Sequence, residues 1–131
     1  MRIRWTGWKR AGIAAAALAL LGAGMLYAAL NKPQTVIHVV TVKWKDGTTE
    51  EQIQNALKGV EKLAQEYPGI RNVWTRSIKV QGPETGVTHA FVMEFASEKA
   101  LAEYAESEYQ REFYKVYLPI RDQTRTFDIT N

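Results

Sequence analysis

Residues 85–104 read TGVTHAFVMEFASEKALAEY, a stretch that joins an apolar run to the start of a helix. The run from Val87 to Phe95 is typical of a buried strand, and Ser97 is placed to cap the helix that follows it. His89 lies inside this strand. The other histidine of the chain, His38, lies inside a second apolar run, VIHVVTVKW, at residues 36–44. The two imidazoles are therefore either hydrogen-bonded members of the core or part of the lining of a cavity.

The other elements follow from the same kind of pattern. After the first strand, KDGTTEEQ turns into a helix that Thr48 and Glu51 would close as a capping box, and YPGI ends that helix. A second strand is expected over 73–80, a further helical segment over 108–118 and a last strand over 124–130. The order β-α-β-β-α-α-β predicts an α+β fold, with one antiparallel sheet and helices on one face.

Both faces of the predicted sheet are apolar. Apart from the histidines, the only charged residues in the first and third strands are Lys43 and Glu94. A sheet that is apolar on both faces needs a cover on each, and the chain has no further helices for the second face. We therefore expect a homodimer in which two sheets face each other.

Charge and composition exclude some functional classes. The 131 residues suffice for one domain of modest size. Residues 1–30 contain four basic and no acidic side chains, whereas residues 31–131 contain thirteen basic and fourteen acidic ones, a net charge of −1. The second part lacks the cationic surface that nucleic acid requires, so we expect no nucleic-acid partner. Because the sequence has no cysteine, it forms no disulfide or thiolate metal site.

The first thirty residues predict a membrane anchor. Residues 1–10 are basic, and residues 11–30 contain no charge and would form about 30 Å of helix, enough to cross a bilayer. The basic flank is expected to stay in the cytoplasm, which makes 11–30 a transmembrane signal-anchor, 31–35 a linker and 36–131 an extracytoplasmic domain. Cleavage after the apolar run would place Leu26 or Tyr27 at the −3 position, where a small residue is needed. There are two alternatives: cleavage that releases a secreted protein, and an insertion that leaves the domain in the cytoplasm.

Four segments resemble one known family. IHVVTVKWKDGTTEEQI, EYPGI, THAFVMEFASEKALAEY and the final TFDI match the order and spacing of the stress-responsive α/β-barrel domains, known as Dabb domains, over residues 36–130. The resemblance implies a ferredoxin-like fold whose sheets pair to form a dimeric α/β barrel. It says less about activity, because most members have no assigned reaction and some are stable structural proteins.

One branch of this family contains polyketide cyclases. In that branch a helix tyrosine and a histidine six residues later carry out acid–base chemistry, and two strand histidines line the same cavity. Carried over by position, the tyrosine is Tyr104 and the strand histidines are His38 and His89, whereas Gln110 takes the place of the catalytic histidine. An amide has no useful basicity near neutral pH, so the cyclase mechanism does not transfer.

The resemblance and the aromatic cluster near Tyr104 together give the candidate site. The ligand-binding candidates are His38, His89, Tyr104, Gln110 and Phe113, and we expect a small apolar or aromatic ligand. The aromatic residues near Tyr104 are typical of helix packing, although buried hydroxyls would also suit a polar-lined cavity. We expect a membrane-anchored, dimeric protein that binds a small molecule or has a stress-related structural role. The alternative is a polyketide-cyclase-like or monooxygenase-like enzyme that uses His38 or His89 with Tyr104.

Metal binding is expected to be weak at most. Some Dabb proteins hold a divalent ion with main-chain carbonyls at the end of the first helix, which here would be those of Ala64, Tyr67 and Ile70. A weak Mg²⁺ site is therefore expected, and no other cofactor. A metal site shared by His38 and His89 is not expected, because antiparallel pairing would put them toward opposite ends of the sheet.

Overall fold

The computed structural model describes residues 32–76 and 85–131. Three predicted segments lie outside the described residues: the basic segment 1–10, the anchor 11–30 and the second half of the second strand, 77–80. In the described part of the chain, no helix is both long and apolar enough to cross a membrane. Pro33–Asn131 forms one structural unit.

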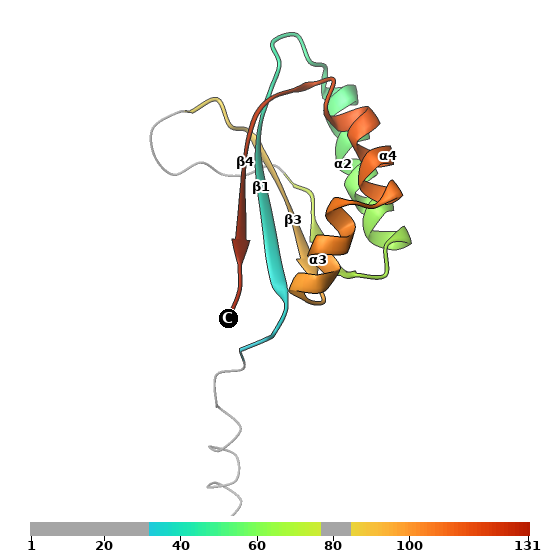
Figure 1. Cartoon of the computed structure of the whole chain (residues 1–131). Helices are drawn as coiled ribbons and strands as arrows, with labels where there is room; N and C mark the ends of the chain where they lie inside the picture. The colour runs from blue at the N-terminus through green and yellow to red at the C-terminus, as the bar shows by residue number, and fades with distance from the viewer. Residues whose placement is uncertain (1–31, 77–84) are drawn as a thin grey trace, which may run out of the picture. The chain divides into compact units, whose positions relative to one another are not determined.

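The described residues form a four-stranded antiparallel sheet with three helices on one face (Figure 1). The strands stand in the order β2-β3-β1-β4. This succession and layering confirm the predicted α+β fold. The strands are β1 (Val36–Trp44), β2 (Ile70–Trp74), β3 (His89–Phe95) and β4 (Arg121–Ile129), and the helices are α2 (Glu50–Glu66), α3 (Glu98–Ala105) and α4 (Glu108–Tyr117).

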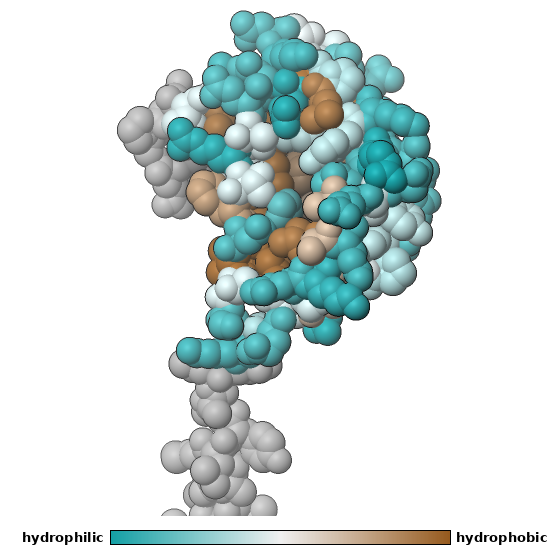
Figure 2. Space-filling view, in the orientation of Figure 1, coloured by the Kyte–Doolittle hydropathy of each residue, from teal (hydrophilic) through white to brown (hydrophobic). Residues whose placement is uncertain are grey.

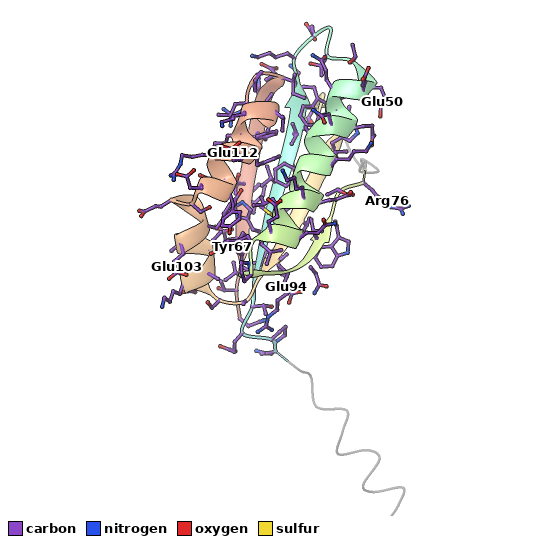
Figure 3. The ribbon with its side chains drawn as sticks, turned by 90° about the vertical axis from the view of Figure 1, so that its right-hand side faces the viewer. Glu50, Tyr67, Arg76, Glu94, Glu103 and Glu112 are labelled. Atoms are coloured by element: carbon purple, nitrogen blue, oxygen red, sulfur yellow. The ribbon has the colours of Figure 1, made fainter. Side chains whose placement is uncertain are left out.

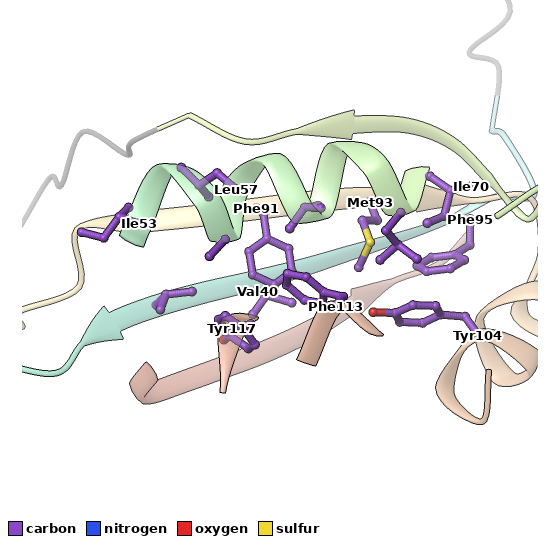
Figure 4. Packing of buried hydrophobic residues seen from close by; sticks show 14 of the residues in the cluster. Val40, Ile53, Leu57, Ile70, Phe91, Met93, Phe95, Tyr104, Phe113 and Tyr117 are labelled. Atoms are coloured by element: carbon purple, nitrogen blue, oxygen red, sulfur yellow. The ribbon is translucent and has the colours of Figure 1, made fainter. Parts of the chain in front are cut away.

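The core lies between the helices and one face of the sheet (Figure 4). Alternate residues of a strand point to the same face, so β1 turns Val36, Val40 and Val42 toward the helices. Helix α2 adds an apolar stripe with helical spacing. The largest completely buried side chains are Phe95, Met93, Val36, Val42 and Val60.

The opposite face of the sheet is not covered by any of the described residues. Val39 is paired with Val92 on one side and with Phe127 on the other, so these side chains share that face. Trp74, Phe127 and Ile129 lie on it with 52%, 54% and 57% of their surface exposed. Apolar side chains also reach the surface in the region of β1 and β4 (Figure 2). This surface, the outer sheet face, is the uncovered second face that the sequence predicted.

The capping box of α2 lies one residue later than predicted. Thr49, not Thr48, is the N-cap: its hydroxyl accepts a hydrogen bond from the Gln52 N–H at 3.2 Å, and Gln52 Oε1 accepts one from the Thr49 N–H at 2.9 Å. A glutamine closes the box as well as a glutamate does, so TTEEQ contains two possible frames. The positive φ of Gly47 and the extended backbone of Thr49 select the second frame.

Three strand boundaries also differ from the prediction. β2 begins at Ile70 and not at residue 73, because the turn at Gly69 already joins the sheet: the Gly69 carbonyl accepts a hydrogen bond from Ala96 N at 2.8 Å. β3 begins at His89, two residues later than expected. β4 begins at Arg121, three residues early, because pairing with β1 starts directly after α4.

Candidate functional site

A pocket of about 210 Å³ lies between α4, the end of α3 and the β1–β4 half of the sheet. Val40, Phe91 and Met93 form an apolar part of its wall, whereas imidazole, hydroxyl, amide and guanidinium groups form the rest. Of the five predicted ligand-binding residues, the pocket brings together His38, Tyr104, Gln110 and Phe113. The four come from β1, α3 and α4, and His89 is not among the lining residues.

His38 is held by an acidic partner. Its Nδ1 lies 2.6 Å from Oδ1 of Asp128, which is the residue opposite it on β4. A carboxylate in this position accepts a hydrogen bond from Nδ1–H, which favours the tautomer that has its lone pair on Nε2. The ring also packs edge-on against Phe95, with 5.9 Å between centroids. These contacts fix the orientation of an imidazole whose side chain is only 15% exposed.

Tyr104 contributes a buried hydroxyl from α3. The residue is 3% exposed, and Figure 4 shows the hydroxyl directed along the core toward Phe113. Burial raises the pKa of Tyr104 far above its ordinary value of 10, and the Gln110 side chain acts in the opposite direction. The hydroxyl therefore stays protonated at neutral pH, where it can donate a hydrogen bond to a ligand but cannot remove a proton from one.

Ser107 joins the two helices that carry Tyr104 and Gln110. Its hydroxyl donates a hydrogen bond to the Tyr104 carbonyl at 2.7 Å and accepts one from the Gln110 N–H at 3.2 Å. It is thus the N-cap of α4, positioned by the last turn of α3. The Ser107 side chain therefore sets the spacing between the Tyr104 hydroxyl and the Gln110 side-chain amide, which both line the pocket.

His89 lies in a different environment from His38. Val42 faces His89 and Met93 faces His38, so the two histidines are four residues apart along β1, roughly 14 Å. Nδ1 of His89 accepts a hydrogen bond from Trp44 Nε1 at 3.0 Å and lies 2.9 Å from the Thr88 hydroxyl. Both facts agree with the expectation that the histidines share no metal site. His89 is a neutral imidazole whose Nδ1 is occupied within the protein.

We predict that His89 makes the protein less stable in mild acid. Burial lowers the pKa of His89 below 6.5, although Glu50 acts in the opposite direction. The unfolded chain therefore takes up this proton at a higher pH than the folded protein does. The stability that neutral His89 contributes is complete above pH 6.5 and is lost as the pH falls through the lower pKa of the folded state.

The matched variant is His89→Asn, because an amide oxygen can still accept the Trp44 hydrogen bond but does not titrate. Between about pH 7.5 and pH 5, the melting temperature of the wild type should fall further than that of His89→Asn. Equal losses in the two proteins would show that His89 has no such role.

The predicted carbonyl site falls at the end of α2. Ala64 lies in its last turn, Tyr67 is the C-cap, and Ile70 begins β2. The Tyr67 carbonyl already accepts a hydrogen bond from Ile70 N at 3.2 Å. Among the described residues, no group of three or more His, Cys, Asp or Glu side chains is placed to hold a metal ion. A Mg²⁺ site built from carbonyls stays a prediction.

Several pocket groups were not predicted. Asp128 orients His38, and Arg121, Thr124 and Thr126 of β4 line the pocket beside it. β4 was identified only as a strand, and its side chains reach the site because it pairs in register with β1, about eighty to ninety residues away in sequence. The alternation of Thr124, Thr126 and Asp128 is the signal that could have placed them on one face.

A larger hollow, of about 520 Å³, lies outside the helix layer between α2 and α4. It holds Phe113 but none of the other candidate residues, and its rim alternates lysines such as Lys58 with glutamates such as Glu112. Seen from the helix side, Glu50, Glu103 and Glu112 project outward from this layer (Figure 3). The helix surface is therefore a solvated one, and the functional candidates gather on its other side.

The family model for the stress-responsive A/B barrel domain, Dabb, matches residues 36–131. The chain belongs to the Dabb family. Its relatives include the stress-response A/B barrel domain-containing protein HS1 of Arabidopsis thaliana, 29% identical over 71% of this chain and 86% of HS1. Olivetolic acid cyclase of Cannabis sativa is 27% identical over 72% of this chain and 95% of the cyclase.

Solved structures share the fold. The Arabidopsis thaliana protein At3g17210 has a TM-score of 0.67 and 27% identity, covering 73% of this chain and 94% of that one. A dimeric ferredoxin-like protein from Thermobifida fusca has a TM-score of 0.64 and 15% identity, covering 78% and 95%. These likenesses confirm the ferredoxin-like fold that the sequence resemblance implied for this Dabb domain.

Proposed function

We propose that this Dabb protein binds a small molecule in the pocket between α4 and the β1–β4 half of the sheet. The proposal rests on one observation: His38, Tyr104 and Gln110 line the same pocket of about 210 Å³, whose remaining wall is partly apolar. An apolar pocket with a few convergent polar groups is the usual form of a ligand site. The hydroxyl and amide can donate hydrogen bonds, and the oriented imidazole can accept one.

Filling the pocket tests this proposal. Thr126→Phe places a ring in the space from an exposed position on β4, so the fold should survive. In a thermal-shift screen of small aromatic compounds, those that raise the melting temperature of the wild type should not raise that of Thr126→Phe. Thr75→Phe, a matched change away from the pocket, should respond as the wild type does. Equal responses of the wild type and Thr126→Phe would place the binding elsewhere.

The protein is also proposed to act as a homodimer through the outer sheet face. More than half of the surface of Trp74, Phe127 and Ile129 is exposed there in a single chain. Three such side chains, beside the half-buried Ile37 and Val39, form the kind of apolar surface that marks a protein interface. The Thermobifida fusca protein that shares this fold is dimeric, which supports the proposed assembly.

A second candidate function is acid–base catalysis, and the short His38–Asp128 contact favours it. An imidazole whose Nδ1 proton is held by a carboxylate is a competent base at Nε2, and protonated Tyr104 could donate to an oxygen that becomes negative. The reaction class would be proton removal next to a carbonyl. Deuterium exchange at the α-carbon of an aryl ketone would test it, because His38→Gln should abolish any exchange that the wild type accelerates.

The proposed cellular location rests on the composition of the first thirty residues. Residues 11–30 are proposed to anchor the protein in the cytoplasmic membrane, with the Dabb domain outside. A protease added to intact cells should then remove the domain, whereas a domain that is cleaved only after lysis would contradict this orientation. A mature N-terminus at or after Met25 would instead favour the secreted form.

A further inference from the structure

We infer that the ligand of this pocket carries a carboxylate, which Arg121 binds at the end of the pocket away from His38. The inference rests on the proposed function and assigns a chemical class to the molecule that fills the pocket. It also revises the expectation of a purely apolar or aromatic ligand. The geometry points to a small body, such as a single ring, with an acid group at one end.

The charge of the pocket is the first argument. Among the described residues, its lining includes Arg121 and no aspartate or glutamate. None of the ion pairs among the described residues includes Arg121, and the neighbouring Asp122 is paired with Lys43 at 2.9 Å. The Arg121 guanidinium is instead held above the ring of Tyr117, with its carbon 5.7 Å from the ring centroid. A permanent cation beside a pocket, without an acidic partner there, favours an anionic ligand.

The same end of the pocket contains a buried hydrogen-bond donor, the Tyr117 hydroxyl. Tyr117 is 3% exposed, and its hydroxyl has no hydrogen-bond partner among the described residues. Burial raises its pKa, with Thr124 and Arg121 acting in the opposite direction, so the hydroxyl keeps its proton at neutral pH. A buried hydroxyl without a partner is costly, and a carboxylate oxygen next to Arg121 would supply the missing acceptor. The Thr124 hydroxyl already donates to the Thr41 carbonyl at 2.9 Å, so among the described residues at this end the free hydroxyl is that of Tyr117.

The orientation of the ligand follows from the residues at the other end of the pocket, where His38 and Asp128 lie. The Asp128 side chain lies against His38 there, so a ligand carboxylate at that end would be brought close to a second carboxyl group. On β4, Thr124 pairs with Val42 and Asp128 pairs with His38. The two ends of the pocket are therefore four strand residues apart, roughly 14 Å along the backbone. The acid group of the ligand therefore lies at Arg121, and its other end faces Tyr104 and Gln110.

The volume limits the size of the ligand. A cavity of about 150 Å³ can hold benzene. The pocket of about 210 Å³ therefore accommodates one ring with a carboxylate and one small polar substituent. Val40, Phe91 and Phe113 supply the apolar contacts for the ring, and the substituent would meet Tyr104 or Gln110.

The test compares 4-hydroxybenzoate with its neutral analogue 4-hydroxybenzamide on the full-length protein. Titration calorimetry should show that the benzoate binds the wild type, and that Arg121→Gln weakens this binding by about 10-fold to 100-fold, since hydrogen bonds to charged groups contribute that much. The amide should bind the two proteins equally. The matched control is Arg125→Gln, an arginine on the same strand but on the outer sheet face, which should leave benzoate binding unchanged.

The outcomes separate this inference from the proposed function. If Thr126→Phe abolishes binding of both compounds while Arg121→Gln changes neither, the pocket binds ligands but the carboxylate assignment is wrong. If Thr126→Phe leaves benzoate binding intact, the pocket itself is the wrong site. Failure of the wild type to bind the benzoate at millimolar concentration would also overturn the inference. Melting curves of each variant confirm that it is folded before binding is compared.

Discussion

Replacing Phe127 with aspartate is expected to convert the protein from a dimer to a monomer. Phe127 stands on β4 beside Val39, with 54% of its surface exposed in a single chain. In a twofold dimer the same patch is used by both copies, so one substitution places two carboxylates in the interface. An unpaired charge in a desolvated interface costs at least several kcal/mol, which is a loss of 10³-fold or more in dimer affinity.

The fold of the single chain should survive this change because Phe127 is not part of its core. Light scattering of the purified protein measures the mass, and circular dichroism checks the secondary structure. Leu118→Asp is the matched control, since Leu118 is an exposed apolar residue at the end of α4, outside the outer sheet face. A Phe127→Asp protein that stays dimeric, or a wild type that is monomeric at micromolar concentration, would show that the outer sheet face is not the interface.

Replacing Phe95 with alanine should cost about 3–5 kcal/mol of unfolding free energy. Phe95 is completely buried, and its ring lies 5.2 Å from that of Tyr104 and 5.9 Å from that of His38 between centroids. Removing it leaves a cavity under two residues of the pocket. Because a domain of this size has a total stability of only about 5–15 kcal/mol, the variant should be close to unfolding at room temperature.

Urea unfolding measures this loss directly. Phe95→Leu retains most of the buried volume and should cost less than about 1.5 kcal/mol. If Phe95→Ala lost no more than Phe95→Leu, the packing around Tyr104 and His38 would differ from the structure described. In the folded fraction, Phe95→Ala should also weaken ligand binding, since both pocket residues lose their support.

Local patterns predicted most of the fold. β1 was predicted with its observed bounds because its mostly apolar run extends from Val36 to Trp44, after which the turn sequence KDG begins. Ser97 caps α3 as expected, with its hydroxyl accepting a hydrogen bond from the Ala100 N–H. The errors were at element ends, as at Ile70, where the first residue of a strand is decided by pairing with a distant strand. Propensity alone does not contain that information.

The site was predicted only in part. Family resemblance selected His38, Tyr104 and Gln110, and the aromatic cluster added Phe113. These four meet at one pocket, whereas His89 lies about four strand residues away beside Trp44. The roles of the polar groups on β4 depend on register across the sheet. A shift of one residue would have turned Thr124, Thr126 and Asp128 to the outer face. No pattern within a single segment reveals that register, which is why the cationic end of the pocket was missed.

The most direct test of the central claim, that the pocket between α4 and β4 is the ligand site, is a crystallographic fragment screen with small aromatic acids. The account predicts that bound fragments gather in the pocket, with the ring against Phe91 and Phe113 and the carboxylate at Arg121 and Tyr117. Fragments that bind elsewhere while the pocket stays empty, or a pocket closed by the side chains of Tyr104 and Gln110, would contradict it.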